Sequence, residues 1–287
     1  MLRLSEVKSV LREYNIHPRK QLGQSFLIDQ NIKNKIIGSI PLNIEGDVLE
    51  IGPGLGALTQ DLCSAAKKVI AVEKDRRLYN FLIKNLSCEN IELINGDILK
   101  YDLSDTVCRQ TETATHGVGQ VVVGNLPYSI SSPILNYLIT NRAHISAVYA
   151  TLQLEFGERV SALPGTKDYG SLSCYAQFYG NPEILFKVPR SAFYPVPEVD
   201  SCFLKIDFKK DIDLSIDQDL LFKIIRSSFV KRRKTILNSL ASSGIFKSKE
   251  VALNCLKQAN ISPDRRPETI SLEEFIGLAT STTRESS

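Results

Sequence analysis

From residue 47 onward, short β-branched runs alternate with longer segments of helical period, and this alternation restricts the fold more than any other feature of the chain. The runs are mostly apolar, as expected of strands that are covered on both faces. The runs that we interpret as strands are residues 48–51, 69–72, 91–94, 121–123, 147–152, 174–179 and 202–208. Because parallel strands joined by helices have this pattern, the sequence predicts an open α/β sheet.

A second, helical domain is predicted to begin near residue 210. Residues 209–219 are acidic and polar, and Ser215 with Gln218 resembles a capping box that opens a helix. Leu221, Ile224 and Ile225 then recur with the period of a helix. We therefore assign residues 1–210 to the α/β domain and residues 211–287 to a small all-helical domain.

Composition excludes several classes of protein. Hydrophobic residues make up 43% of the 287 residues, which is ordinary globular composition, and the net charge of +3 is too small to indicate a nucleic-acid partner by itself. The six cysteines form no C-x-x-C pair and the three histidines have no ligand spacing, so we expect neither a disulfide framework nor a metal site. With no signal-like or membrane-spanning run, the chain is expected to be a cytoplasmic protein that does not contact membranes.

The first predicted strand is followed at once by a glycine-rich turn, Glu50-Ile51-Gly52-Pro53-Gly54-Leu55-Gly56. Such a turn lets backbone N–H groups approach a ligand at a helix N-terminus, although tight packing alone produces similar turns. The third glycine arrives one residue earlier than in the dinucleotide fingerprint, which disfavours NAD.

Two carboxylates are expected at the same edge of the sheet. Glu73 ends the second strand and Asp97 follows the third. Carboxyl ends of parallel strands meet at the edge where open α/β sheets bind ligands. One carboxylate suits the hydroxyls of a ribose and the other an adenine amino group, so we expect an adenosine-containing ligand. The alternative is that both are ordinary solvated charges at strand ends.

The fourth strand leads into Gly124-Asn125-Leu126-Pro127-Tyr128, which indicates a particular chemistry. An amine on an aromatic ring is a poor nucleophile because its lone pair is delocalised. The Asn125 side-chain oxygen and the backbone carbonyl of Leu126 or Pro127 can accept hydrogen bonds from such an amine and localise that pair. Proline fixes the backbone here, and Tyr128 offers a ring for stacking on a flipped base. The alternative is a β-turn that buries a tyrosine.

A basic cluster near the end of the chain is suited to phosphates. It consists of Arg226 and of Lys231, Arg232, Arg233 and Lys234, which we place on a helix, with Arg265 and Arg266 further on. Arg19 and Lys20 can add a second basic patch. The alternative is a solvated helix face.

In these motifs the chain resembles the ribosomal RNA adenine dimethyltransferase family, whose bacterial members dimethylate two adjacent adenines near the end of small-subunit ribosomal RNA. The resemblance extends over residues 19–27, 50–59, 96–97, 125–128, 153–159, 193–201 and 229–237, with Glu73. It implies a Rossmann-like, seven-stranded class I methyltransferase sheet with a small C-terminal helical domain that binds RNA.

The resemblance also implies roles for individual residues. S-adenosylmethionine would be held by Gln24, Ser25, Leu27, Gly52, Gly54, Glu73, Asp97 and Asn125. Tyr128 and Phe193 would stack on the flipped adenine. The expected partner is ribosomal RNA in the precursor of the small ribosomal subunit, bound by a monomer.

Two alternatives stay open at this stage. An antibiotic-resistance methyltransferase that acts on an adenine of large-subunit ribosomal RNA has the same catalytic motifs. A non-catalytic ribosome-assembly factor or transcription factor of this fold would keep the sheet without the reaction.

Overall fold

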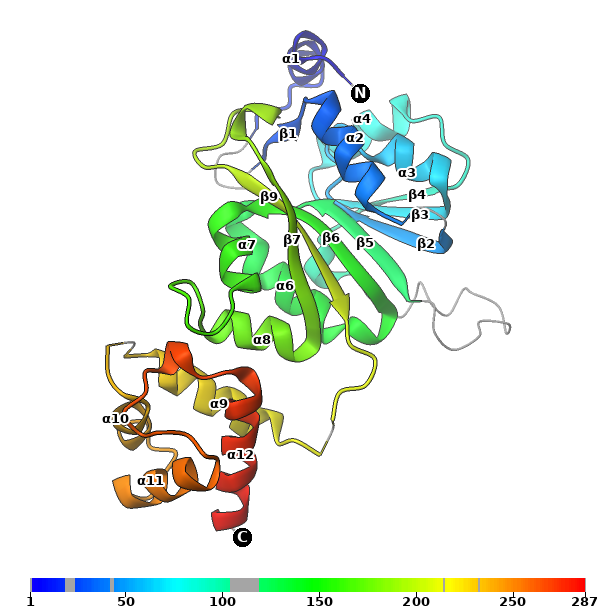
Figure 1. Cartoon of the computed structure of the whole chain (residues 1–287). Coiled ribbons are helices and arrows are strands. Elements are labelled where there is room, and N and C mark those ends of the chain that lie inside the picture. Colours follow the sequence, from blue (N-terminus) through cyan, green and yellow to red (C-terminus); the bar gives the residue numbers. More distant parts are fainter. Residues whose placement is uncertain are drawn as a thin grey trace. The chain divides into compact units, whose positions relative to one another are not determined.

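The computed structural model describes residues 2–18, 24–41, 44–103, 119–213, 215–231 and 233–286 of the chain. The chain divides into two compact units, one of Met1–Gly157 with Glu183–Phe208 and one of Glu158–Pro182 with Lys209–Ser287 (Figure 1). The predicted boundary after residue 210 lies near the last crossing between them. Glu158–Pro182, which we assigned to the first domain, instead groups with the C-terminal helices.

A seven-stranded sheet with the order β4-β3-β2-β5-β6-β9-β7 forms the frame of the first unit, which confirms the predicted α/β fold class. Its strands are β2 (Ile44–Ile51), β3 (Ala66–Glu73), β4 (Ile91–Asn95), β5 (Gln120–Asn125), β6 (Ile145–Gln153), β7 (Gly180–Val188) and β9 (Ser201–Phe208). A separate two-stranded ribbon pairs β1 (Phe26–Leu27) with β8 (Phe193–Tyr194) in antiparallel orientation.

Strand order reverses at β2, and this reversal creates the ligand-binding edge. β2 pairs in parallel with β3 on one side and with β5 on the other, so that Ile51 lies opposite both Val72 and Gly124. β9 joins the far side of β6 in antiparallel orientation. Open α/β sheets bind ligands beyond the carboxyl ends of the strands at such a switch point.

Helices cover both faces of the sheet in the first unit. Figure 1 shows α2, α3 and α4 on one face and α6 on the other. The helices are α1 (Leu4–Glu13), α2 (Gln30–Ser39), α3 (Thr59–Ala65), α4 (Arg76–Asn85) and α6 (Ser131–Thr140), and α7 (Leu154–Ser161) begins in this unit and continues into the second from Glu158. The 3-10 turns are η2 (Ile98–Lys100), η3 (Tyr128–Ile130), η4 (Arg142–His144) and η5 (Arg190–Ala192). Aspartates begin two of the helices: Asp29 accepts from Asn31 N–H and Ile32 N–H, and Asp75 accepts from Arg77 N–H.

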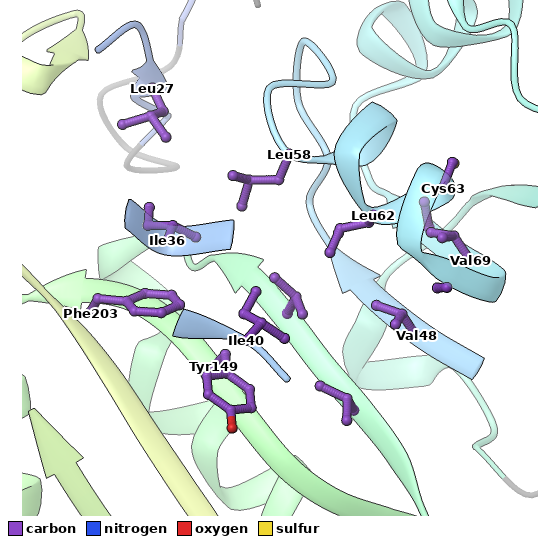
Figure 2. Close-up of a cluster of buried hydrophobic side chains, with 14 of the residues drawn as sticks. Leu27, Ile36, Ile40, Val48, Leu58, Leu62, Cys63, Val69, Tyr149 and Phe203 are labelled. Atoms are coloured by element: carbon purple, nitrogen blue, oxygen red, sulfur yellow. The ribbon is translucent and has the colours of Figure 1, made fainter. Parts of the chain in front are cut away.

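One apolar cluster connects the sheet with the helices above it. Figure 2 shows Ile36 of α2, Ile40 directly after it and Leu62 of α3 packed over Val48, Val69 and Phe203 of the sheet. These side chains are all less than a twentieth exposed. Because burial of each contributes about 1.5–3 kcal/mol, this layer holds the helices that begin beside the ligand-binding edge.

The second unit is helical. Its elements are α8 (Ser171–Tyr179), α9 (Gln218–Phe229), α10 (Ile236–Ala241), α11 (Lys249–Gln258), η6 (Pro267–Thr269) and α12 (Leu272–Ser286). Phe222 of α9 packs against the rings of Tyr175, Phe178 and Tyr179, with centroids 5.2 to 5.8 Å apart.

The structure contradicts the sequence-based predictions for residues 174–179 and for the start of α9. Residues 174–179 form part of helix α8 and not a strand, because this short aromatic run packs along α9, and periodicity alone cannot distinguish a buried helix from a strand. Helix α9 is capped by Asp217, whose carboxylate accepts from Leu220 N–H at 2.9 Å, and not by Ser215.

We expect Gly124→Ala to destabilise the first unit. A Cβ at this position would lie 2.7 Å from the Ile51 carbonyl oxygen and 3.2 Å from its Cβ, and backbone cannot easily move inside a paired sheet. The free energy of unfolding should fall by about 1–3 kcal/mol in urea titrations. Gly38→Ala is the matched control, because a Cβ there meets nothing within 4 Å, and a helix gains up to about 1 kcal/mol from alanine. Equal stability of Gly124→Ala and the wild type would contradict this account.

Candidate active site

The glycine-rich turn after β2 has a backbone that requires glycine. Gly52, Gly54 and Gly56 have φ values of +66°, +60° and +77°, a region that residues with a Cβ rarely adopt. A Cβ at Gly52 would meet no atom within 4 Å, so the backbone there borders open space. Gly52 N–H donates to the Val72 carbonyl at 3.0 Å, which fixes the turn to β3.

A cavity of about 450 Å³ opens at this edge of the sheet. Its wall includes residues from the ends of β2, β3 and β5 and from the ribbon of β1 and β8. The sequence-predicted residues that line it are Gln24, Ser25, Leu27, Gly52, Gly54, Glu73, Asp97, Asn125, Pro127 and Phe193. The fold therefore brings together side chains that are up to 169 positions apart in the sequence (from Gln24 to Phe193).

Glu73, at the end of β3, holds the glycine-rich turn. Its Oε2 accepts from Gly54 N–H at 3.1 Å and its Oε1 from Asp75 N–H at 2.8 Å. Burial raises the pKa of this carboxyl above its ordinary value, since the residue is only 6% exposed. Glu73 thus connects the turn to the start of α4 and also faces the cavity.

Glu50 is a second buried carboxyl in the cavity wall, and sequence reasoning did not assign it a role. It is 2% exposed, and its Oε2 has no hydrogen-bond partner among the described residues. Burial raises its pKa to about 8, with a smaller contribution from the charge of Glu73. The only signal in the sequence is a charged residue inside the apolar run 48–51.

Asp97 follows β4, and its pKa shifts in the opposite direction to those of the two glutamates. Lys74 Nζ lies 2.7 Å from its Oδ2, and this ion pair holds the pKa of Asp97 below its usual range. Its Oδ1 accepts from Leu99 N–H at 3.2 Å and caps η2. The carboxylate is therefore fixed in position at the cavity wall.

Asn125 is the last residue of β5, and its side-chain amide is held through the nitrogen atom. Its Nδ2 donates to the Ser25 carbonyl oxygen at 2.7 Å. Because the amide nitrogen is engaged there, the amide oxygen is the atom left to accept from a ligand. The contact also connects the fourth strand of the predicted sheet to the segment just before β1.

The residues after Asn125 are arranged unevenly around the cavity. Pro127 lines it, and its carbonyl accepts from Ile130 N–H at 3.1 Å and from Ser131 Oγ at 3.2 Å. Leu126 and Tyr128 are not in the cavity wall; the Tyr128 hydroxyl lies 2.6 Å from Ser201 Oγ. Phe193 is in the wall but is only 1% exposed.

The predicted RNA-binding residues of the second unit that the structure describes lie on its surface, but some of them lie in a turn where we predicted a helix. Arg226 is exposed in the last turn of α9. Lys231, Arg233 and Lys234 are exposed in the turn that follows, so the prediction that they lie on a helix was wrong. Arg265 instead pairs with Glu274, with Nη2 3.0 Å from Oε2. Arg19, Lys20 and Arg232 lie outside the described residues.

Two absences can be stated for the described part of the chain. No group of three or more His, Cys, Asp or Glu side chains gathers there as a metal site would require. No helix in those same ranges is long and apolar enough to cross a bilayer.

Comparison with known proteins identifies the family. The ribosomal RNA adenine dimethylase family matches residues 15–278. Relatives named ribosomal RNA small subunit methyltransferase A include one from Pelotomaculum thermopropionicum, 42% identical over 96% of this chain and 95% of its own. Another, from Moorella thermoacetica, is 44% identical over 94% of each chain.

Two solved structures are similar over nearly the whole chain. A dimethyladenosine transferase from Plasmodium falciparum has a TM-score of 0.74 at 26% identity and covers 91% of this chain and 98% of its own. The 23S rRNA methyltransferase ErmE has a TM-score of 0.68 at 25% identity and covers 90% and 99%. Sequence and fold thus agree, and the chain belongs to the ribosomal RNA adenine dimethylase family.

Proposed function

We propose that this protein transfers methyl groups from S-adenosylmethionine to the N6 amino groups of two adjacent adenosines near the 3′ end of small-subunit ribosomal RNA. Its substrate is the precursor of the small ribosomal subunit in the cytoplasm, and the protein acts on it as a monomer during subunit biogenesis. The observation that carries the proposal is the Asn125 side chain, anchored through its nitrogen to Ser25 at the wall of a cavity suited to a cationic nucleoside.

The charges in the cavity wall support this donor. S-adenosylmethionine carries an adenosine and an overall positive charge, and when bound it supplies an electrophilic methyl group on a sulfonium. Glu50 and Glu73 are buried carboxyls at the ends of adjacent strands, and a cation beside them offsets the unfavourable burial of their charge. We assign the ribose to Glu73, the adenine to Asp97 and the methionine part to the turn at Gly52. The unpartnered Glu50 Oε2 is available to a donor group of the same ligand.

Asn125 and its neighbours support activation of the acceptor. Positive charge develops on the attacking amine, and a fixed amide oxygen stabilises it more in the transition state than in the ground state. The Pro127 carbonyl already accepts two hydrogen bonds, whereas no described residue donates to the Leu126 carbonyl. We therefore assign the second acceptor to Leu126. Tyr128 and Phe193 are the rings assigned to the flipped base.

A second candidate is methylation of large-subunit ribosomal RNA. The similarity to the 23S rRNA methyltransferase ErmE favours it, since the two folds correspond over nine-tenths of this chain. The higher identity to proteins named for the small subunit favours our first choice.

Incubation with labelled donor tests the choice between the two. We expect purified protein to produce N6,N6-dimethyladenosine at two adjacent positions near the 3′ end of small-subunit RNA in precursor particles, measured by mass spectrometry and primer extension. Purified large subunits serve as the control substrate. Label confined to large-subunit RNA would support the second candidate, and no label in either RNA would contradict both.

Asn125→Ala should reduce the turnover number by about 10²–10³-fold, because it removes one preorganised acceptor from the transition state. The affinity for S-adenosylhomocysteine, measured by calorimetry, should fall far less than the turnover. Asn34→Ala, at an exposed position on α2, is the control and should retain full activity. Wild-type turnover in Asn125→Ala would exclude this mechanism and favour a non-catalytic role for the segment.

Glu50→Gln should change how the stability of the unliganded protein depends on pH. The folded state retains the Glu50 proton up to its pKa of about 8, whereas the ordinary value is 4.5. Unfolding between these values releases a proton, so the free energy of unfolding contributed by Glu50 falls as pH rises from 4.5 to about 8. A glutamine side chain cannot ionise, so this variant should be more stable than wild type at the upper end of that window and similar at the lower end.

Urea titrations across the same pH range measure the effect. Glu89→Gln, at an exposed position before β4, is the matched control and should reproduce the wild-type slope. Parallel curves for wild type and Glu50→Gln would show that Glu50 is not protonated in the folded protein.

A further inference from the structure

Helix α1 lies before the segment that the family model matches, and it packs against the cavity wall. The match to the family model begins at residue 15, and α1 spans Leu4–Glu13. Val7 and Leu11, its two buried residues, form a cluster with Ile16, Phe26 and Leu78. Figure 1 shows α1 beside β1 in the same unit. Phe26 and Leu78 also line the cavity, so each has one side toward the ligand and the other toward α1.

Phe26 connects α1 to the glycine-rich turn. The residue is 7% exposed, and a Cβ added at Gly54 would come within 3.3 Å of its ring. The Phe26 ring therefore lies in close contact with the backbone of the glycine-rich turn, which we propose binds the methyl donor. Since interiors are packed to crystal-like density, loss of the α1 side chains behind this ring leaves it free to move.

The β1–β8 ribbon connects α1 to Asn125, the residue that we assign to the target amine. Phe26 lies opposite Tyr194 and Leu27 opposite Phe193. Lys8 of α1 places its Nζ 5.3 Å from the centre of the Tyr194 ring, so the helix contacts both strands. Ser25, just before the ribbon, is the residue that holds the Asn125 amide.

The segment after α1 is attached to α4, which forms another part of the wall. Arg77 donates to the Asn15 carbonyl oxygen, and Asn85 Nδ2 donates to the Tyr14 hydroxyl at 3.1 Å. The Tyr14 ring meets Phe81 edge-on with centroids 5.1 Å apart. Arg77 and Leu78 line the cavity from the first turn of this helix.

We infer that α1 is a positioning element. It holds the Phe26 ring in place at the cavity wall and, through the β1–β8 ribbon, aligns the side chain of Asn125. This inference rests on the proposed function for the identity of the ligand. The side chains of Val7 and Leu11 do not line the cavity and act through residues of their cluster that do, chiefly Phe26 and Leu78, so they influence donor binding without touching the donor.

The experiment compares full-length variants by calorimetric titration with S-adenosylhomocysteine. We expect the double variant Val7→Ala/Leu11→Ala to raise the dissociation constant by about 3- to 30-fold, the range typical of residues that act on a site indirectly. Methyl transfer to small-subunit particles should show a lower turnover number as well, because Asn125 is anchored to the same ribbon. The conservative variant Val7→Ile/Leu11→Met, which keeps large apolar side chains at both positions, should retain both quantities near their wild-type values.

Leu138→Ala separates positioning from general destabilisation. Leu138 is a buried residue of α6 in the same unit and does not line the cavity, so its variant should lower the melting temperature and leave the dissociation constant unchanged. A double variant that melts early but binds within about twofold of wild type, well below the range of indirect effects, would overturn the inference. If the double variant does not fold, Leu11→Ala alone is interpreted in the same way. Wild-type protein that does not bind the compound at all would instead overturn the proposed function.

Discussion

The two hydrogen bonds from backbone N–H groups to Glu73 are the constraint on which the cavity depends. They join the turn after β2 to the start of α4 through one carboxylate at the end of β3, at 3.1 Å and 2.8 Å. Parallel pairing of β2 with β3 brings these segments to the same edge, and the turn, whose three glycines have positive φ values, borders open space at Gly52. The carboxyl oxygens thus perform a structural task that an apolar side chain of the same size cannot, because the N–H groups would then be buried without an acceptor.

The position of the Asn125 side chain likewise depends on one hydrogen bond, to the Ser25 carbonyl. Asn125 is held at 2.7 Å by a carbonyl 100 positions earlier in the chain, so its free oxygen has a defined direction before any base arrives. Preorganised dipoles stabilise a transition state because they need no reorientation during the reaction. The Ser25 carbonyl belongs to the segment that leads into β1, and the ribbon, the cavity wall and the end of β5 at Asn125 consequently form one connected assembly.

Much of the fold could be predicted because β-branched runs in a parallel sheet are apolar on both faces, and five of those runs fall within β2 to β6 of the sheet. The run 174–179 was misassigned because its burial comes from Phe222, 43 to 48 positions later, which periodicity does not reveal. Glu73, Asp97 and Asn125 could be predicted to lie at the cavity because each stands at or just after the end of an apolar run. The burial of Glu50 and the support that α1 gives to Phe26 depend on tertiary contacts, and no local pattern indicates them.

The second unit is made from two separate stretches, Glu158–Pro182 and Lys209–Ser287, with part of the first unit between them. As the chain emerges during synthesis, α8 therefore appears well before α9, and its aromatic side chains have no Phe222 to pack against until some forty residues later. A nascent chain interrupted after β9 exposes an apolar helix face of the kind that chaperones bind. Because the helical unit consists of two separate stretches of the chain, replacing everything after one position with the sequence of a relative would not exchange the whole unit.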